Sequence, residues 1–208
     1  MTKLKPEYYQ NPDVIFLAQD LLGKILFTNK NGLLTAGIIT ETEAYFGKED
    51  KASHAYGGRR TLRTEAMYQP GGFSYIYLCY GIHYLFNIVV SQEDDPKSIL
   101  VRSVEPYLEI SVIEKRRNRP VSDKATSSGP GSVCKALGID NTFNKKFLGG
   151  DEVWIENAGL QYGIDDITST PRIGVAYAEE HALLQLRFYL KNNFYVSKGK
   201  KQSKIQNS

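Results

Sequence analysis

Hydrophobic and polar positions repeat with two periods along this chain, which predicts mixed α and β structure. Apolar residues recur at helical spacing from Val14 to Leu22, with Asn11 and Pro12 as a cap and first helical position and Gly23 as an end. Apolar stretches of strand composition occupy residues 24–28, 33–45, 73–80, 83–90, 98–104, 151–157, 171–177 and 186–190. Short turns join several of them, so we expect mostly antiparallel pairing.

The remaining segments predict two more helices and a long loop. Glu105 and Pro106 open a predicted helix that runs to Arg117, and a shorter helix is predicted at residues 132–137. Residues 46–72 show no clear period and are rich in glycine and charge. A loop of this length in a compact domain is usually functional.

Composition excludes several classes of protein. The chain has 208 residues, 41% of them hydrophobic, a net charge of +3 and two cysteines. Two cysteines are too few for a disulfide scaffold or a structural zinc site. No apolar run is long enough for a membrane span, and the amino terminus has no signal-peptide core. We therefore expect a soluble protein of the reducing cytoplasm.

The distribution of charge is more informative than its sum. Basic residues cluster at 59–63, at 115–124 and in the tail at 198–208, whereas residues 41–50 hold four acids against one lysine. An acidic strip between basic patches suits chemistry on a bound polyanion. Solvated surface faces are the alternative, and charge alone favours them.

Two carboxylates lie close together on the strand predicted at residues 33–45. Strict alternation places Ile39, Glu41, Glu43 and Tyr45 on one face. Paired carboxylates on an apolar face cost stability when they are desolvated, and such groups commonly serve as general bases. A solvent-facing polar strand is the alternative.

Tyrosines crowd the hairpin predicted at residues 73–90. Tyr75 and Tyr77 share a face, where aromatic side chains more often form core than a ligand platform, whereas Tyr80 lies at the turn. His54 follows Glu43 by eleven residues and lies in the glycine-rich loop, from which it could fold back over Tyr45. The histidines lack metal-ligand spacing, and no nucleotide-hydrolase or nicotinamide motif occurs, so neither a metal nor a cofactor is expected.

Several blocks are highly specific when their order and spacing are taken together. They are GIITETEAYFGKEDKASHAYGGRRTLR, MYQPGGFSYIYLCYGIHYLFNIV and ILVRSVEP, with LLGKIL before them and SGPGSVCKALGID, PRIGVAYA and LRFYL after them. Through these blocks, over residues 10–197, the chain resembles the alkyladenine (3-methyladenine) DNA glycosylases, the type unrelated to the helix-hairpin-helix glycosylases.

The resemblance implies the fold and the centre of the reaction. It implies a single α+β domain over residues 1–197, built on a curved, mostly antiparallel sheet with peripheral helices and a protruding hairpin. A basic tail at residues 198–208, expected to be disordered, follows it. Glu43 is implied to be the general base that activates water, and Arg102 to help hold that water and the carboxylate.

It also implies how a base would be held outside the duplex. Tyr45, His54 and Tyr77 would form a stacking pocket, in which His54 would also hydrogen-bond the purine edge. Asn87 would crowd the exocyclic amine of normal guanine and so reject it. Tyr80 would fill the gap that the extruded nucleotide leaves in the duplex.

The resemblance also implies which basic residues would bind the DNA backbone. Arg59 and Arg63 are implied phosphate contacts. Two positions depart from the family's pattern: Ser132 stands where a lysine is usual, and His83 stands where relatives carry another aromatic residue beside the wedge. The lysines of the tail could offset the first departure.

The implied reaction is hydrolysis of an N-glycosidic bond through an oxocarbenium-like sugar, which a nearby carboxylate stabilises. Damaged purines in double-stranded DNA are the implied substrates; the residues leave open the preference among 3-methyladenine, 7-methylguanine, hypoxanthine and etheno-adenine. No lysine lies among the site blocks to form a Schiff base, so we expect a monofunctional hydrolase, acting as a monomer without a cofactor.

Two alternatives belong to other classes of protein. One is a non-catalytic binder of distorted duplex, which would gain nothing from a carboxylate near phosphates. The other is a carbohydrate hydrolase that uses Glu41 and Glu43. Residues two apart on a strand lie only about 6.6 Å apart and point the same way, so they cannot flank a bond from opposite sides.

Overall fold

One antiparallel sheet organises the part of the chain that this computed structural model describes, residues 1–160 and 162–199. Its strands are β1 (Thr2–Lys3), β2 (Ile25–Lys30), β3 (Leu33–Tyr45), β4 (Ser74–Cys79), β5 (His83–Val90), β6 (Lys97–Leu108), β7 (Val153–Asn157), β8 (Ile167–Thr170) and β9 (Arg187–Leu190). The helices are α1 (Pro6–Tyr9), α2 (Val14–Asp20), α3 (Ile110–Arg117) and α4 (Pro130–Leu137), with short 3-10 turns between them. The described residues therefore form one α+β domain, as expected.

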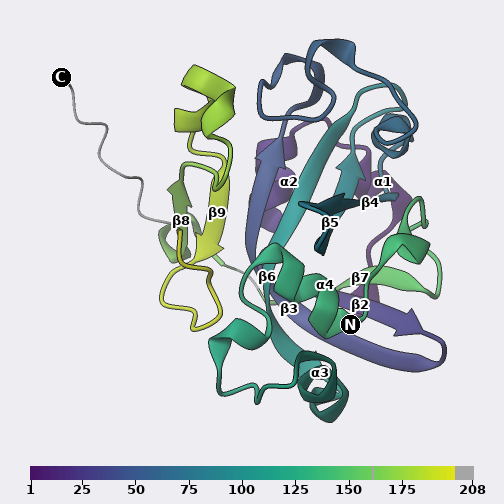
Figure 1. Cartoon of the computed structure of the whole chain (residues 1–208), viewed down its shortest axis with the longest axis vertical. Coiled ribbons are helices and arrows are strands. Elements are labelled where there is room, and N and C mark those ends of the chain that lie inside the picture. Colours follow the sequence, from purple (N-terminus) through teal and green to yellow (C-terminus); the bar gives the residue numbers. More distant parts are fainter. Residues whose placement is uncertain (161, 200–208) are drawn as a thin grey trace.

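The long strand β3 is the spine of the sheet. The strand order is β1-β7-β2-β3-β6-β5-β4, and β9 also pairs with β3 and carries β8 at its outer side. Along one edge of β3, β2 pairs with residues 33–38 and β9 with residues 41–43. Figure 1 shows this fork: the β2–β3 hairpin crosses the lower part of the molecule, and β9 stands beside the upper part of β3. The second half of β3 therefore lies between two partner strands.

A bulge in β3 corrects one prediction from alternation. Ile39 pairs with Val104 and Glu41 with Ser103, so two residues of β3 advance against one of β6. The side chain of Ile39 consequently lies in the main hydrophobic core and not on the face of Glu41. Glu41, Glu43 and Tyr45 keep a common face, as predicted.

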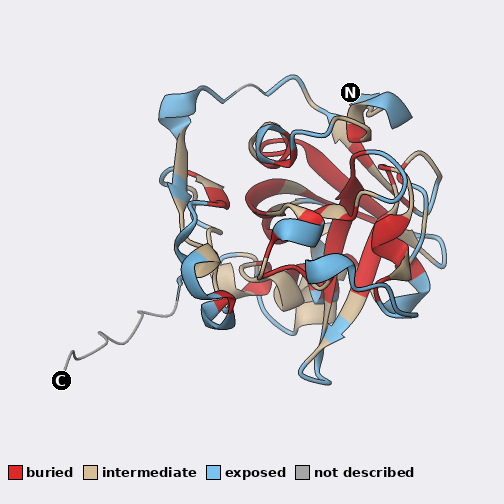
Figure 2. Cartoon of the chain, turned by 90° about the horizontal axis from the view of Figure 1, so that it is seen from above, coloured by how far each residue is buried: buried red, intermediate tan, exposed pale blue. Residues whose placement is uncertain are grey.

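The main core lies on the face of the sheet that α2 and α4 cover. Thr42 of β3 donates its hydroxyl hydrogen bond to the carbonyl of Ala18 in α2, and Thr28 of β2 donates to the carbonyl of Leu137 in α4. Figure 2 shows buried residues in red on the central strands and exposed segments around them. The opposite face of β3 is left for a smaller apolar cluster and, at its carboxyl end, for a cavity.

Two helix starts differ from the prediction. Asp13, not Asn11, caps α2: its carboxylate accepts hydrogen bonds from the backbone N–H groups of Ile15 and Phe16. Pro12 therefore precedes the helix. Helix α4 starts at Pro130, two residues earlier than predicted, with proline in the first turn.

The helix predicted to open at Glu105 was wrong. Both Glu105 and Pro106 continue β6, where they pair with Ile38 and Gly37 of β3. Glu109 then takes a left-handed conformation (φ 54°) and separates the strand from α3. The sheet pairing overrides the local helix signal.

The strand predicted at residues 171–177 was also wrong. Apolar residues at Ile173, Val175 and Tyr177 imitate strand alternation, but Gly174 has a φ of 80° and the chain turns there. A strand that the sequence pattern did not indicate, β8, precedes this segment. The irregular segment instead reaches over the cavity face of β3.

Apart from the strand predicted at residues 98–104, which extends to Leu108 as β6, the other predicted strands lie within two residues of the observed ones. The segment 46–72 forms no α-helix or strand, as expected, and holds three short 3-10 turns. Residues 200–208, most of the predicted basic tail, lie outside the described residues. No helix among the described residues is long and apolar enough to cross a membrane.

Candidate active site

A cavity of about 510 Å³ opens on the face of β3 opposite to α2. Strands β3, β4, β5 and β6 form its floor, and the segments 52–54, 63–67 and 173–177 form its walls. The volume falls within the usual range for small-molecule sites, about 300–1,000 Å³. Predicted site residues that line it are Tyr45, His54, Arg63, Tyr77, Tyr80, Asn87 and Arg102.

Glu43 lies directly behind the wall of this cavity and is fully buried. Its Oε2 accepts a hydrogen bond from the hydroxyl of Tyr45 at 2.8 Å, and its Oε1 accepts one from the backbone N–H of Ile173 at 2.7 Å. Arg102 Nη1 lies 3.3 Å from the same Oε1. All three partners line the cavity, whereas Glu43 is not itself a lining residue, so its carboxylate lies just behind the cavity surface and away from bulk solvent.

Arg102 links the two carboxylates of β3. Its Nε donates to Glu41 Oε1 at 2.9 Å, whereas Nη1 approaches Glu43. Burial alone would lower the pKa of Arg102, but the charges of Glu43 and Glu41 outweigh it and raise the pKa above its ordinary value. The guanidinium is therefore a fixed cation at the cavity floor.

Aromatic rings form the rest of the pocket. Tyr75 and Tyr77 are stacked with centroids 5.5 Å apart, as their shared face predicted, and the ring of His54 meets Tyr77 edge-on at 4.6 Å. His54 Nδ1 lies 2.8 Å from the hydroxyl of Tyr75, so the loop histidine folds onto these two rings. Burial, helped by the charges of Arg63 and Arg59, lowers the pKa of His54 to about 4. His54 is therefore neutral at neutral pH.

Asn87 is fixed on the neighbouring strand β5. It is 3% exposed, and its amide nitrogen donates to the carbonyl of Tyr75 at 3.1 Å. This bond holds the side chain against the floor of the cavity beside Tyr77.

Tyr80 occupies the tip of the β4–β5 hairpin and is 90% exposed. It has a φ of 50° and Gly81 a φ of 71°, and Ile82 N–H closes the turn on the carbonyl of Cys79 at 3.0 Å. A left-handed conformation costs a non-glycine residue about 1–2 kcal/mol. A large exposed ring held at such a position is typical of a contact surface and not of a core.

The ion pairs separate the basic residues near the cavity into two groups. Arg60 is paired with Glu65 and Asp94, and Lys51 with two acids of the 176–183 segment. Arg59 and Arg63 are exposed and form no ion pair within the described residues. The guanidinium of Arg63 lies 5.3 Å from the ring centroid of Tyr77, at the cavity mouth. These two arginines are the ones predicted to contact phosphate.

One arginine of the basic cluster at residues 115–124 has a structural role. Arg117 donates to the carbonyls of Ala125 and Thr126 and to the hydroxyl of Ser132, so it holds the loop before α4. His83 packs against Gly131, where a Cβ atom would meet its ring at 2.8 Å. Ser132 in the first turn of α4 and His83 at the start of β5, the two departures noted in the sequence, therefore both lie near the start of α4.

Pattern reasoning missed Arg172 and Asp50. Their side chains form a fully buried ion pair, with Arg172 Nη2 2.9 Å from Asp50 Oδ1. The guanidinium of Arg172 also lies 4.7 Å from the ring centroid of Tyr45 and donates to the carbonyl of Ala44 at 3.0 Å. The next residue is Ile173, which bonds Glu43. The only sequence signal was their place in two of the resembling blocks.

Glu41 does not face the cavity. It is fully buried and bonded by Arg102, Arg187, Ser103 and Ser197. A carboxylate with both oxygens occupied in this way cannot serve as the second acid of a carbohydrate hydrolase. Within the described residues, no three histidine, cysteine or acidic side chains gather as a metal site would require.

Comparisons with known proteins identify the family of this chain. Residues 7–194 match the family model described as methylpurine-DNA glycosylase (MPG). A protein of Clostridium acetobutylicum, named a candidate 3-methyladenine DNA glycosylase, is 42% identical over 206 residues, covering 96% of this chain and 99% of its own. A protein of the same name from Chlamydia abortus is 42% identical over 190 residues, covering 90% and 97%. The chain belongs to the methylpurine-DNA glycosylase family.

Proposed function

We propose that this protein is a DNA glycosylase that hydrolyses the N-glycosidic bond of alkylated or deaminated purines in duplex DNA, as the first step of base excision repair. The observation that carries the proposal is the place of Glu43: a buried carboxylate held against a cavity lined with tyrosines. Family membership supports the substrate class.

The pocket suits a purine taken out of the stack. Flipping costs least for a damaged base, because damage weakens its pairing. Inside the cavity, Tyr45, Tyr77 and His54 offer ring surfaces, and a cationic alkylated purine gains about 0.5–2 kcal/mol per ring when desolvated. Neutral His54 keeps Nε2 for the base, because its Nδ1 is bonded to Tyr75.

Glu43 can activate water without losing its present partners. An ionised carboxylate offers about four lone-pair sites, and Tyr45, Ile173 and Arg102 approach three of them. A water bound at the remaining site would lie between Glu43 and the sugar of the flipped nucleotide. Glu43 would take its proton while stabilising the oxocarbenium-like sugar.

No lysine lines the cavity in the described part of the chain, which supports a monofunctional hydrolase that leaves an abasic site without cutting the strand. Alkylation at N3 or N7 already makes the purine a good leaving group, so a second acid is not needed. We further propose that the protein acts as a monomer on cytoplasmic DNA, which suits a search along a duplex.

A panel of duplexes tests this function. Each carries one lesion: 3-methyladenine, as a stable analogue, 7-methylguanine, hypoxanthine or etheno-adenine. We expect free base and an alkali-labile site from at least one lesion, no release from an undamaged duplex, and no strand cleavage before alkali. Tight binding without release from any lesion would instead indicate a non-catalytic binder.

Replacing Tyr80 with alanine should weaken binding to a lesion duplex while leaving the fold stable. The exposed ring has no packing to lose, but stacking on a base is worth about 1–3 kcal/mol, or about 5- to 150-fold in Kd. Fluorescence anisotropy with a labelled duplex and thermal unfolding measure the two effects. Tyr107→Ala, which removes a half-exposed tyrosine of β6, is the control. Equal binding by the Tyr80 variant would contradict its role as a wedge.

The salt dependence of binding should identify the phosphate contacts. Each cation that neutralises a phosphate contributes about 0.9 to the slope of log Kd against log salt. Arg59→Ala and Arg63→Ala should each reduce the slope by about that amount. Arg60→Ala should not, because Glu65 and Asp94 already neutralise this residue. A wild-type titration independent of salt would count against DNA as the ligand.

A further inference from the structure

Glu41 is a buried carboxylate that the proposed reaction leaves without a role. Within the described residues it accepts five hydrogen bonds. Oε1 accepts from Arg102 Nε (2.9 Å), Arg187 Nε (2.6 Å) and Ser197 Oγ (2.8 Å). Oε2 accepts from Ser103 Oγ and from the backbone N–H of Ser197, both at 2.7 Å. A single buried side chain thus joins β3, β6, β9 and the carboxyl-terminal segment.

The charges in this cluster are balanced. Burial alone would raise the pKa of Glu41, but Arg102 and Arg187 outweigh it and hold the pKa below its ordinary value. Two buried cations therefore face two buried carboxylates, Glu41 and Glu43. Arg102 lies closer to Glu41 (2.9 Å) than to Glu43 (3.3 Å), so most of its hydrogen bonding is directed away from the proposed base.

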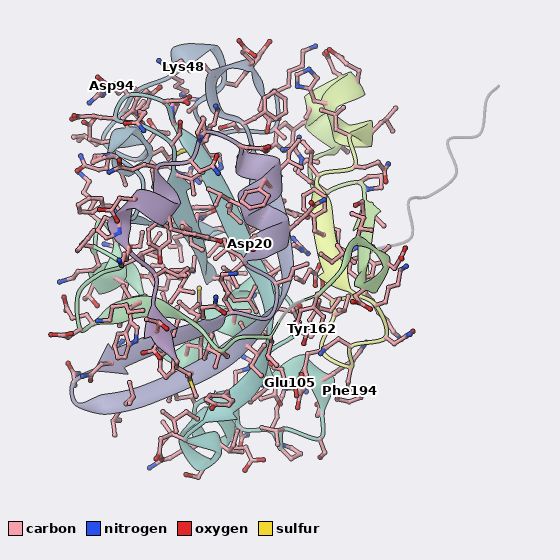
Figure 3. The ribbon with its side chains drawn as sticks, turned by 180° about the vertical axis from the view of Figure 1, so that it is seen from behind. Asp20, Lys48, Asp94, Glu105, Tyr162 and Phe194 are labelled. Carbon is pink, nitrogen blue, oxygen red and sulfur yellow. The ribbon has the colours of Figure 1, made fainter. Side chains whose placement is uncertain are left out.

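The segment after β9 completes this cluster. Besides its two bonds to Glu41, Ser197 accepts a hydrogen bond at its carbonyl from Arg187 Nη2 at 2.8 Å. The segment is docked further by Asn193, which donates to Glu105 at 3.0 Å. Figure 3 shows Phe194, the next residue after Asn193, beside Glu105 in the lower half of the view. Ser197 is therefore held in place by Glu41, which also holds Arg102, and by Arg187.

We propose that Glu41 is a positioning residue for base release, acting through Arg102, and that Ser197 of the carboxyl-terminal segment completes its binding site. The proposal rests on the proposed function of Glu43. While Glu41 holds Arg102 Nε, the guanidinium can offer Glu43 only one nitrogen. Without the charge of Glu41, the guanidinium is free to turn and bind Glu43 through two nitrogens, which would occupy the site for water and weaken the base.

The full-length Glu41→Gln protein tests this step. We expect its single-turnover rate of base release to fall about tenfold at saturating protein, with Kd for the lesion duplex within about twofold of wild type. On the acid side of the pH profile, the pH at which the rate is half-maximal should be about one unit lower than in wild type. The reason is that an uncompensated Arg102 favours the ionised carboxylate. Besides Arg102, the charged or titratable groups near Glu43 are the same in both proteins: Tyr45, Tyr77, Arg172 and Tyr177.

Ser197→Ala is the milder second variant, and it decides the question if Glu41→Gln does not fold. It removes the hydrogen bond from the Ser197 hydroxyl to Glu41 and the longer one, at 3.4 Å, that this hydroxyl accepts from Arg102 Nη2. We therefore expect a rate about three- to tenfold lower and an unchanged Kd. Ser169→Ala on the exposed part of β8 is the matched control and should behave as wild type.

A folded Glu41→Gln protein with the wild-type pH profile would show a structural role only and overturn the proposal. Wild-type rates in Ser197→Ala would overturn it too. If the wild-type protein itself releases no base, the proposed function fails first.

Discussion

Replacing Glu43 with glutamine is expected to slow base release from a lesion duplex by a factor of about 10²–10⁴, without weakening the binding of that duplex. The substitution preserves shape. In the variant, the amide oxygen can still accept the hydrogen bond from the backbone N–H of Ile173. The amide nitrogen can donate to the hydroxyl of Tyr45, which in the wild-type protein donates to the carboxylate. What the amide cannot do is accept a proton from water.

Single-turnover release and anisotropy with the same duplex separate the two effects. Glu49→Gln is the control, because Glu49 is an exposed acid in the loop that follows β3. Release at the wild-type rate by the Glu43 variant would refute the role of Glu43 as the base. A matching loss of affinity would mean that Glu43 acts in binding.

The second large effect is expected from Asp50→Asn, which breaks the buried pair with Arg172. Both side chains are fully buried, and removing one partner leaves an uncompensated charge in the interior. Such a change costs about 3–5 kcal/mol of unfolding free energy. Because Arg172 lies against the ring of Tyr45 and precedes Ile173, base release should fall as well.

Urea unfolding measures this loss, with Asp94→Asn as the control. Asp94 pairs with Arg60 at the surface, where an ion pair contributes only about 0–1 kcal/mol. A loss below about 1 kcal/mol for the Asp50 variant would contradict the view that this pair fastens the loop after β3 to the 172–175 segment.

Local patterns predicted the elements on which the site is built. The strand at residues 33–45 has the predicted bounds, and the shared face of Glu43 and Tyr45 followed from its alternation. The shared face of Tyr75 and Tyr77, whose rings are stacked, and the position of Tyr80 at a turn followed in the same way. These properties depend on neighbours in the sequence, which is why a pattern can contain them.

Properties that depend on distant partners were not predictable. The bulge that turns Ile39 into the core arises from pairing with β6, and the helix signal at Glu105 lost to the same pairing. The bonds from Arg187 and Ser197 to Glu41 span 146 and 156 residues. Ile173 contributes a backbone N–H, to which the side-chain pattern gives no clue.

The most direct test is a crystal structure of the Glu43→Gln protein bound to a duplex with one etheno-adenine. We expect the lesion base inside the cavity between Tyr45, Tyr77 and His54, the ring of Tyr80 in the gap in the duplex, and the glycosidic carbon facing residue 43. A duplex bound elsewhere on the protein, or a lesion still stacked in the helix above an empty cavity, would contradict the account.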